Sequence, residues 1–180
     1  MVRKIVKVKD PRLRKRSKKI QKVDKKIKAL INDLSDTLIN QKDPEGVGLA
    51  APQIGKNLRL FVMKSKDKGR VFINPKIVFS SDKSTKKVNQ ISTISPKKIM
   101  EGCLSLPHFY GPLTRSKKVR LEFTNELGKK RVDTFEGFEA QIIQHEIDHL
   151  NGVLFIDRLL EQKKPLYELV NGEWEEVELL

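Results

Sequence analysis

The sequence predicts an α+β fold: mixed or antiparallel strands around a central helix that carries an HExxH pattern. Apolar residues recur every three or four positions in 17–39 and 136–150, the spacing of helices with one buried face. Apolar and polar residues alternate in 118–124 and 129–135, as in paired strands. The chain shows no internal repeat or linker, so residues 1–180 are expected to form one catalytic domain.

Shorter elements complete the predicted fold. Asn171-Gly172 separates two alternating runs and suits a type I′ turn, so a hairpin is expected over 166–179. A polar, Ser- and Lys-rich stretch at 80–98 predicts an exposed loop insertion. Further strands are expected at 2–8, 58–63 and 71–79, the last interrupted by Asn74-Pro75.

The charge of the chain is strongly basic and uneven. The formal net charge is +14, and residues 1–30 carry 14 Lys or Arg against two acids. Such a face attracts polyanions, with ribosomal or other RNA the obvious candidates, although a lysine-rich solvated surface has the same composition. Lysines without clustered aromatic residues predict no sequence-specific nucleic-acid binding. No apolar stretch approaches the ~20 residues that cross a bilayer, and a single cysteine cannot form an internal disulfide.

The segment His145-Glu-Ile-Asp-His149 is the strongest chemical signal. A spacing of four places both imidazoles on one helix face, where they can bind one metal ion. Glu146 lies at the edge of that face, so we expect it to act as a general base on water. Chance histidines on a surface helix are the alternative, but the chain holds only three.

A catalytic metal site also needs a third protein ligand. The residues alone leave three candidates open: Cys103, His108 or a downstream acid. Cys103 taken alone would be a buried core cysteine, and His108 a loop residue. Gln53 follows a run of small residues and is expected to donate to an oxyanion, unless it is simply buried and hydrogen-bonded.

Three segments, taken together and in order, resemble the motifs of the peptide deformylases, which remove the formyl group from the initiator methionine of nascent chains. They are Gly46-Val-Gly-Leu-Ala-Ala-Pro-Gln53, Glu101-Gly-Cys-Leu-Ser105 and Gln144-His-Glu-Ile-Asp-His149. The resemblance covers roughly residues 5–160. Three features depart from the family pattern: the long stretch before Glu101, His108 in place of a common glycine, and an acidic hairpin in place of a basic C-terminal helix.

The resemblance implies a role for each matching residue. Cys103, His145 and His149 would be the metal ligands, Glu146 the general base, and Gln53 and the N–H of Leu104 the oxyanion donors. The substrate residues implied are Val47, Gly48, Phe138 and Ile142, with Gly48 contacting the peptide backbone. The implied ion is Fe²⁺, with Zn²⁺ or Ni²⁺ able to replace it. From the sequence we further predict that Glu101 pairs with Arg115 and that Asp148 supports the site from outside it.

Two other functions compete with this prediction. An HExxH peptidase would hydrolyse unformylated peptides, but such enzymes use His or an acid rather than cysteine as third ligand. A non-enzymatic RNA- or ribosome-binding module would explain the charge, but not the intact catalytic positions. The expected partners are nascent formylmethionyl peptides and, transiently, the ribosome, with no membrane. The lack of an apolar leader predicts the bacterial cytoplasm, while the basic start leaves an organelle open.

Overall fold

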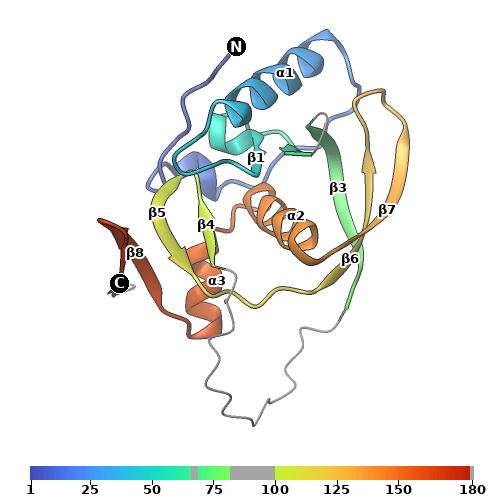
Figure 1. Cartoon of the computed structure of the whole chain (residues 1–180). Coiled ribbons are helices and arrows are strands. Elements are labelled where there is room, and N and C mark those ends of the chain that lie inside the picture. The colour runs from blue at the N-terminus through green and yellow to red at the C-terminus, as the bar shows by residue number, and fades with distance from the viewer. Residues whose placement is uncertain (66–68, 82–99, 179–180) are drawn as a thin grey trace.

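Two antiparallel sheets and three α-helices make up the computed structural model, which describes residues 1–65, 69–81 and 100–178 (Figure 1). The predicted α+β class is confirmed. The elements in chain order are η1 (Pro11–Arg14), α1 (Lys25–Ile39), β1 (Gly48–Ala50), η2 (Ala51–Ile54), β2 (Leu60–Met63), β3 (Arg70–Ser80), β4 (Glu101–Cys103), β5 (Leu106–Gly111), β6 (Lys118–Thr124), β7 (Lys130–Glu136), α2 (Gly137–Leu150), α3 (Phe155–Gln162), β8 (Leu166–Val170) and β9 (Glu173–Val177).

The larger sheet has the order β1-β2-β3-β6-β7 and is covered on both faces. Strand β2 lies between the two covering layers, because all four of its residues are apolar and fully buried. Leu60 and Val62 pack in the cluster under α1, whereas Phe61 and Met63 pack in the cluster under α2. Alternate side chains of a strand point to opposite faces of the sheet. One face of this sheet therefore packs against α1 and the other against α2 (Figure 1).

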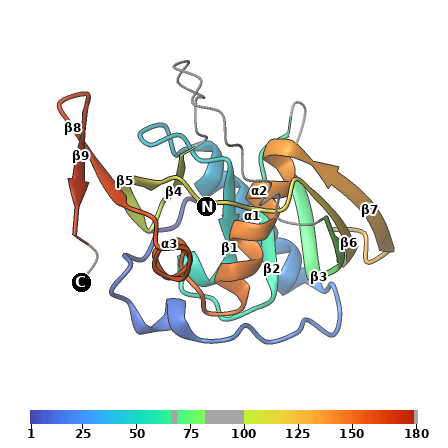
Figure 2. The same ribbon diagram turned by 90° about the horizontal axis from the view of Figure 1, so that it is seen from below.

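The smaller sheet has the order β4-β5-β8-β9, with α3 packed against it. Its apolar cluster joins Cys103 of β4 to Phe155 and Leu159 of α3 and to Leu166 of β8. The hairpin β8–β9 extends from one side of the molecule (Figure 2). Asn171 and Gly172 both have positive φ, as a type I′ turn requires.

Helix α2 ends where the sequence predicts. Asn151 is its C-terminal cap, and Gly152 follows with φ +77°, the left-handed conformation that favours glycine. A side chain at Gly152 would collide with the backbone of Arg14. The glycine therefore stops the helix and lets the segment after η1 pass close to it.

Two expectations near the N-terminus are wrong. Residues 2–8 form no strand. The N–H of Val6 donates to the carbonyl of Gln53 and that of Val8 to the carbonyl of Ser105, but these bonds do not form a continuous strand pairing. The first helix begins at Lys25 and not at Ser17, because Asp24 caps it by accepting from the N–H of Ile27. Residues 17–24 are extended instead, and an apolar residue every third position fits either conformation.

Several elements differ from the sequence prediction in other ways. The segment 48–54 is a short strand followed by a 3₁₀ turn. The sequence pattern does not predict β4, β5 or α3. Strand β3 runs through Asn74-Pro75, where its register with β6 shifts. Apart from Ser80 and Ser81, the predicted loop insertion at 80–98 lies outside the described residues. Among the described residues, no helix is long and apolar enough to cross a membrane.

Candidate metal centre

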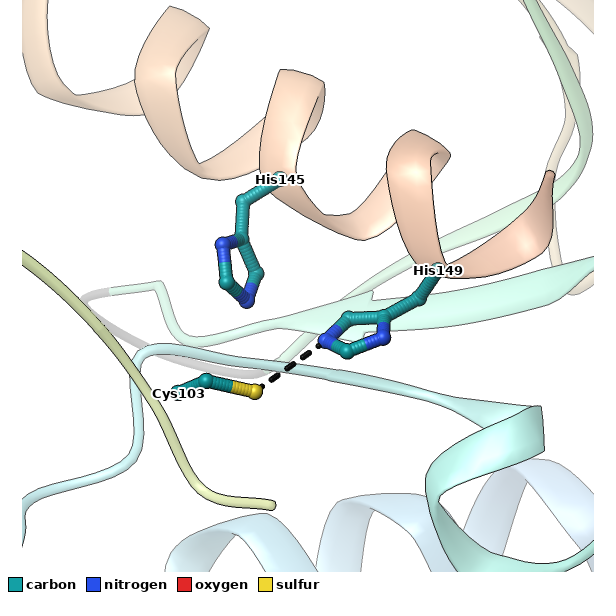
Figure 3. Close-up of side chains that lie close together, drawn as sticks. All are labelled: Cys103, His145 and His149. Atoms are coloured by element: carbon teal, nitrogen blue, oxygen red, sulfur yellow. Dashed lines mark hydrogen bonds between the residues drawn. The ribbon is translucent and has the colours of Figure 1, made fainter. Parts of the chain in front are cut away.

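Cys103, His145 and His149 lie together on facing elements (Figure 3). Each offers one potential ligand atom, and these atoms all lie within 4.8 Å of one another. The Cys103 Sγ is 3.2 Å from the His149 Nε2. The two histidines come from successive turns of α2, with ring centroids 4.8 Å apart, and the cysteine comes from the end of β4. All three side chains are buried.

Gly102 explains how β4 brings Cys103 to this point. A side chain at Gly102 would lie 2.6 Å from the Tyr110 ring on β5. The pairing of β4 with β5 also shifts register between Gly102 and Cys103. The glycine lets the two strands come close, and the shift turns the cysteine towards α2.

A chain of buried charges orients the first histidine. His145 Nδ1 lies 2.8 Å from Glu101 Oε1, which leaves Nε2 free for a metal ion. Arg115 donates to Glu101 at 2.5 and 3.0 Å and to Asp148 at 2.6 Å. The predicted pairing of Glu101 with Arg115 is therefore confirmed. Asp148 also accepts from Arg158, at 2.7 Å. Its carboxylate contacts Arg115, which in turn contacts Glu101, so Asp148 lies outside the three potential ligands, as predicted.

These contacts set the charge of two groups. Burial alone would raise the pKa of Glu101, but hydrogen bonds from His145 and Arg115 lower it to about 2. Burial likewise opposes ionisation of the Cys103 thiol, yet the neighbouring His149 and His145 hold its pKa well below the usual value. This direction favours the thiolate, the form of cysteine that binds metal ions.

Glu146 has the environment of a general base. It is 3% exposed, and burial raises its pKa to about 7. Its Oε2 has no hydrogen-bond partner among the described residues, and the side chain borders a cavity. Gly48 makes room for it, since a side chain there would collide with Glu146 and lie 2.9 Å from Ile142. A buried, unpaired carboxylate beside open space is available for proton transfer.

The side chain of Gln53 is held by the backbone three residues before it. Its Oε1 accepts from the N–H of Ala50 at 2.8 Å, which directs Nε2 towards the site. That nitrogen lies 3.6 Å from the Cys103 Sγ and 3.4 Å from the Ser105 Oγ. The side chain therefore presents a fixed N–H donor beside the potential ligands. Leu104, the next residue after Cys103, borders the same cavity.

The cavity beside these residues has a volume of about 230 Å³. All four residues expected to bind the substrate line it: Val47, Gly48, Phe138 and Ile142. Sequence reasoning missed other lining residues, among them Met100 and Tyr110, which carry no motif. His108, an alternative third ligand, lies in β5 and borders the cavity, but it is not part of the cluster of potential ligands.

The residues present fit a divalent metal ion. One thiolate and two imidazoles are a donor set for Fe²⁺, Zn²⁺ or Ni²⁺. His145 has a carboxylate on its other ring nitrogen, the usual support of a metal-bound histidine. Glu146, beside the three donors, has a free oxygen that is suited to contact water and not the metal.

Comparison with known proteins agrees with this geometry. A family model described as polypeptide deformylase matches residues 2–165. The chain belongs to the peptide deformylase family. A peptide deformylase of Pseudothermotoga lettingae is 42% identical over 175 residues, which cover 94% of this chain and 93% of that relative.

Solved structures of peptide deformylases share the fold. The enzyme of Legionella pneumophila has a TM-score of 0.75 and 41% identity, covering 88% of this chain and 86% of that one. The enzyme of Thermotoga maritima has a TM-score of 0.73 and 36% identity, covering 88% and 97%. As a peptide deformylase, the chain is a metal-dependent hydrolase that removes the N-terminal formyl group from newly made polypeptides.

Proposed function

We propose that Cys103, His145 and His149 hold the catalytic metal and that Fe²⁺ is the ion in the cell, with Zn²⁺ or Ni²⁺ able to replace it. The convergence of one thiolate and two imidazoles within 4.8 Å supports this ligand set. A soft thiolate combined with imidazoles accepts each of these ions. The bound ion would supply Lewis-acid polarisation of the formyl group and would acidify the attacking water.

The cavity orients the substrate. We assign the methionine side chain to the apolar wall formed by Val47, Phe138 and Ile142, which border one continuous space. Gly48 lies against Glu146 and Ile142 with no side chain of its own, so the peptide backbone can approach it closely. A formyl carbon carries only hydrogen, and its position therefore needs no acyl pocket.

Glu146 moves the proton in the proposed reaction. Its carboxylate accepts a proton from the attacking water, whose oxygen forms a bond to the formyl carbon. The same carboxyl then gives that proton to the nitrogen as the C–N bond breaks. The products are formic acid and a free amino terminus, and the acid's remaining proton passes to the amine or to solvent to leave formate, so atoms and charge balance. Burial of Glu146, which raises its pKa to about 7, suits both steps near neutral pH.

We assign two N–H groups as hydrogen-bond donors that stabilise the negative charge developing on the formyl oxygen. They are the Nε2 of Gln53, fixed by its contact with Ala50, and the backbone N–H of Leu104. Donors that are oriented before the reaction stabilise this charge without reorganisation.

The single observation that carries this mechanism is the buried Glu146 with an unpartnered oxygen beside the three ligands. We expect Glu146→Gln to lose at least ~100-fold in turnover of formyl-Met-Ala-Ser and to keep its metal. Protein purified without oxygen is assayed for formate release, and its metal is measured by elemental analysis. Glu139→Gln, an exposed acid on the same helix, is the matched control and should keep full activity.

Full activity in Glu146→Gln would overturn the assignment. Hydrolysis of unformylated Met-Ala-Ser, with no formate from the formylated peptide, would instead favour a peptidase of the HExxH type.

The cellular setting is also a proposal. The basic N-terminal region supports transient association with the ribosome, where formylated nascent chains emerge. We propose a bacterial cytoplasmic location, which the match to peptide deformylases of Pseudothermotoga lettingae and other bacteria supports. We further propose that residues 1–180 act as one catalytic domain with the β8–β9 hairpin as its last element.

A further inference from the structure

We propose that a basic groove on the surface of this chain docks the phosphate backbone of structured RNA. The groove is a hollow of about 810 Å³. Its cationic lining comprises Arg16, Lys19, Arg59, Lys76, Lys130 and Arg131. The proposal deepens the suggested ribosome association, because it names the surface and the chemistry of the contact. Only the cellular role of RNA binding rests on that association.

One wall of the groove is an extended segment, residues 15–22, held firmly in place. The N–H of Ser17 donates to Leu150 at 2.9 Å and that of Lys18 to Asn57 at 3.2 Å. The N–H of Ile20 donates to the Asn74 side chain at 2.9 Å. Figure 2 shows the segment after η1 passing along one edge of the molecule. Its backbone is thus fixed while its Lys and Arg side chains remain exposed.

Arg59 lines the groove, and none of its hydrogen-bond partners among the described residues is a carboxylate. Its guanidinium donates to the carbonyl of Pro75 at 3.0 Å and to the Asn151 side chain at 2.9 Å, and not to a carboxylate. Burial, followed by the nearby charge of Arg16, lowers its pKa. Arg16 and Arg59 line the same hollow, and an anion bound there would relieve the repulsion between their like charges.

The other cations of the groove are also poorly neutralised. Within the described residues, Arg16, Lys19, Lys76 and Lys130 form no salt bridge, whereas Arg3, Arg12 and Arg14 each bind an aspartate. Arg131 approaches Asp133 only at 3.6 Å. Glu122 is the one acid in the lining, opposite Lys76 in the β3–β6 register. The positive charge of this hollow is thus largely free to bind phosphates.

The shape and lining favour an RNA backbone over other polyanions. A concave hollow receives a ridge of phosphates, which a flat membrane surface does not offer. Phe123, the aromatic residue of the lining, is 7% exposed and cannot stack on bases. Ser17 also lines the groove, and its buried hydroxyl has no hydrogen-bond partner among the described residues. Binding should therefore depend on charge and shape, without base readout.

The test compares two triple charge reversals in the full chain. Arg16→Glu, Lys19→Glu and Lys130→Glu are combined to reverse the groove. Lys4→Glu, Lys7→Glu and Lys28→Glu are combined as a control, which changes the net charge equally at exposed positions outside the lining. Affinity for a fluorescent RNA hairpin is measured by anisotropy as salt increases. Formate release from formyl-Met-Ala-Ser is measured in parallel.

We expect the groove variant to lose about tenfold or more in RNA affinity and the slope of log K against log salt to fall by about three. The control should bind RNA nearly as the unaltered chain does, and both should keep full deformylation. Equal losses in both variants would show a diffuse charge effect and overturn the proposal. So would binding to anionic lipid vesicles with no binding to RNA. Because activity is a separate readout, failure here is distinguishable from failure of the proposed mechanism.

Discussion

At the scale of single residues, the site has no room for a side chain at Gly48. The space that a side chain would fill at this position is occupied by Glu146 and by Ile142, which would lie 2.9 Å away. Glu146 can reach the cavity only because β1 presents bare backbone there. The glycine thus couples the position of Glu146, the proposed general base, to the wall proposed to face the substrate.

Gly48→Ala is expected to displace Glu146 and lower kcat/KM for formyl-Met-Ala-Ser by roughly 100-fold, since small displacements of catalytic groups have effects of this size. Steady-state kinetics measures the change. Gly69→Ala is the matched control, because its added carbon would meet no atom closer than 3.6 Å. A Gly48→Ala enzyme as active as that control would contradict the account.

The sequence predicts these residues unequally. The spacing of His145 and His149 determines their helix face, so their convergence follows from local geometry. Cys103 joins them only through the register shift of β4, which a sequence does not show. Tyr110 and Met100 reach the cavity through tertiary packing alone, and no local pattern marks them.

At the scale of elements, Arg115 joins β4 to α2. Its guanidinium binds Glu101 on β4 and Asp148 on α2, and its side chain is only 10% exposed. The arginine therefore fixes the strand that carries the cysteine relative to the helix that carries both histidines. Arg158 of α3 adds a second cation on Asp148.

Removing that guanidinium leaves two buried carboxylates without their shared cation. We expect Arg115→Ala to lower the free energy of unfolding by about 3 kcal/mol, the usual effect of breaking a buried ion pair, and to reduce metal retention. Urea denaturation and elemental analysis measure the two effects. The exposed Arg120→Ala should alter neither. Unchanged stability and metal content in Arg115→Ala would show that the bridge is unimportant.

Elements are predictable where their pattern is unambiguous. The boundaries of α2 and β6 agree with the sequence prediction, because the apolar periodicity of each segment ends where residues that stop the element begin. The sequence wrongly predicts a helix over residues 17–24, because Ile20 and Val23 fit a helix as well as an extended chain. Hydrogen bonds to Asn57, Asn74 and Leu150, all distant in sequence, decide between the two.

At the scale of the whole molecule, the hairpin β8–β9 is held by few buried residues. Leu166 is its one buried residue, and β9 is largely exposed. Trp174, the only tryptophan in the chain, packs edge-on against Tyr110 at a centroid distance of 5.3 Å. Tyr110 in turn borders the cavity. One fluorophore therefore reports on the docking of the hairpin beside the site.

We expect the hairpin to detach before the body of the protein unfolds, because few buried contacts hold it. In a urea titration, tryptophan fluorescence should change at a lower concentration than the helical circular dichroism signal. Superimposable transitions from both probes would instead show that the hairpin unfolds together with the rest.

The central claim is that Cys103, and not His108, completes the metal site with His145 and His149. Elemental analysis of Cys103→Ala, His149→Ala and His108→Ala tests it most directly, because His108 is the remaining histidine of the chain. We expect His108→Ala to keep the metal content of the unaltered protein, and the other two variants to lose most of theirs. Loss of metal in His108→Ala, with retention in Cys103→Ala, would contradict the account.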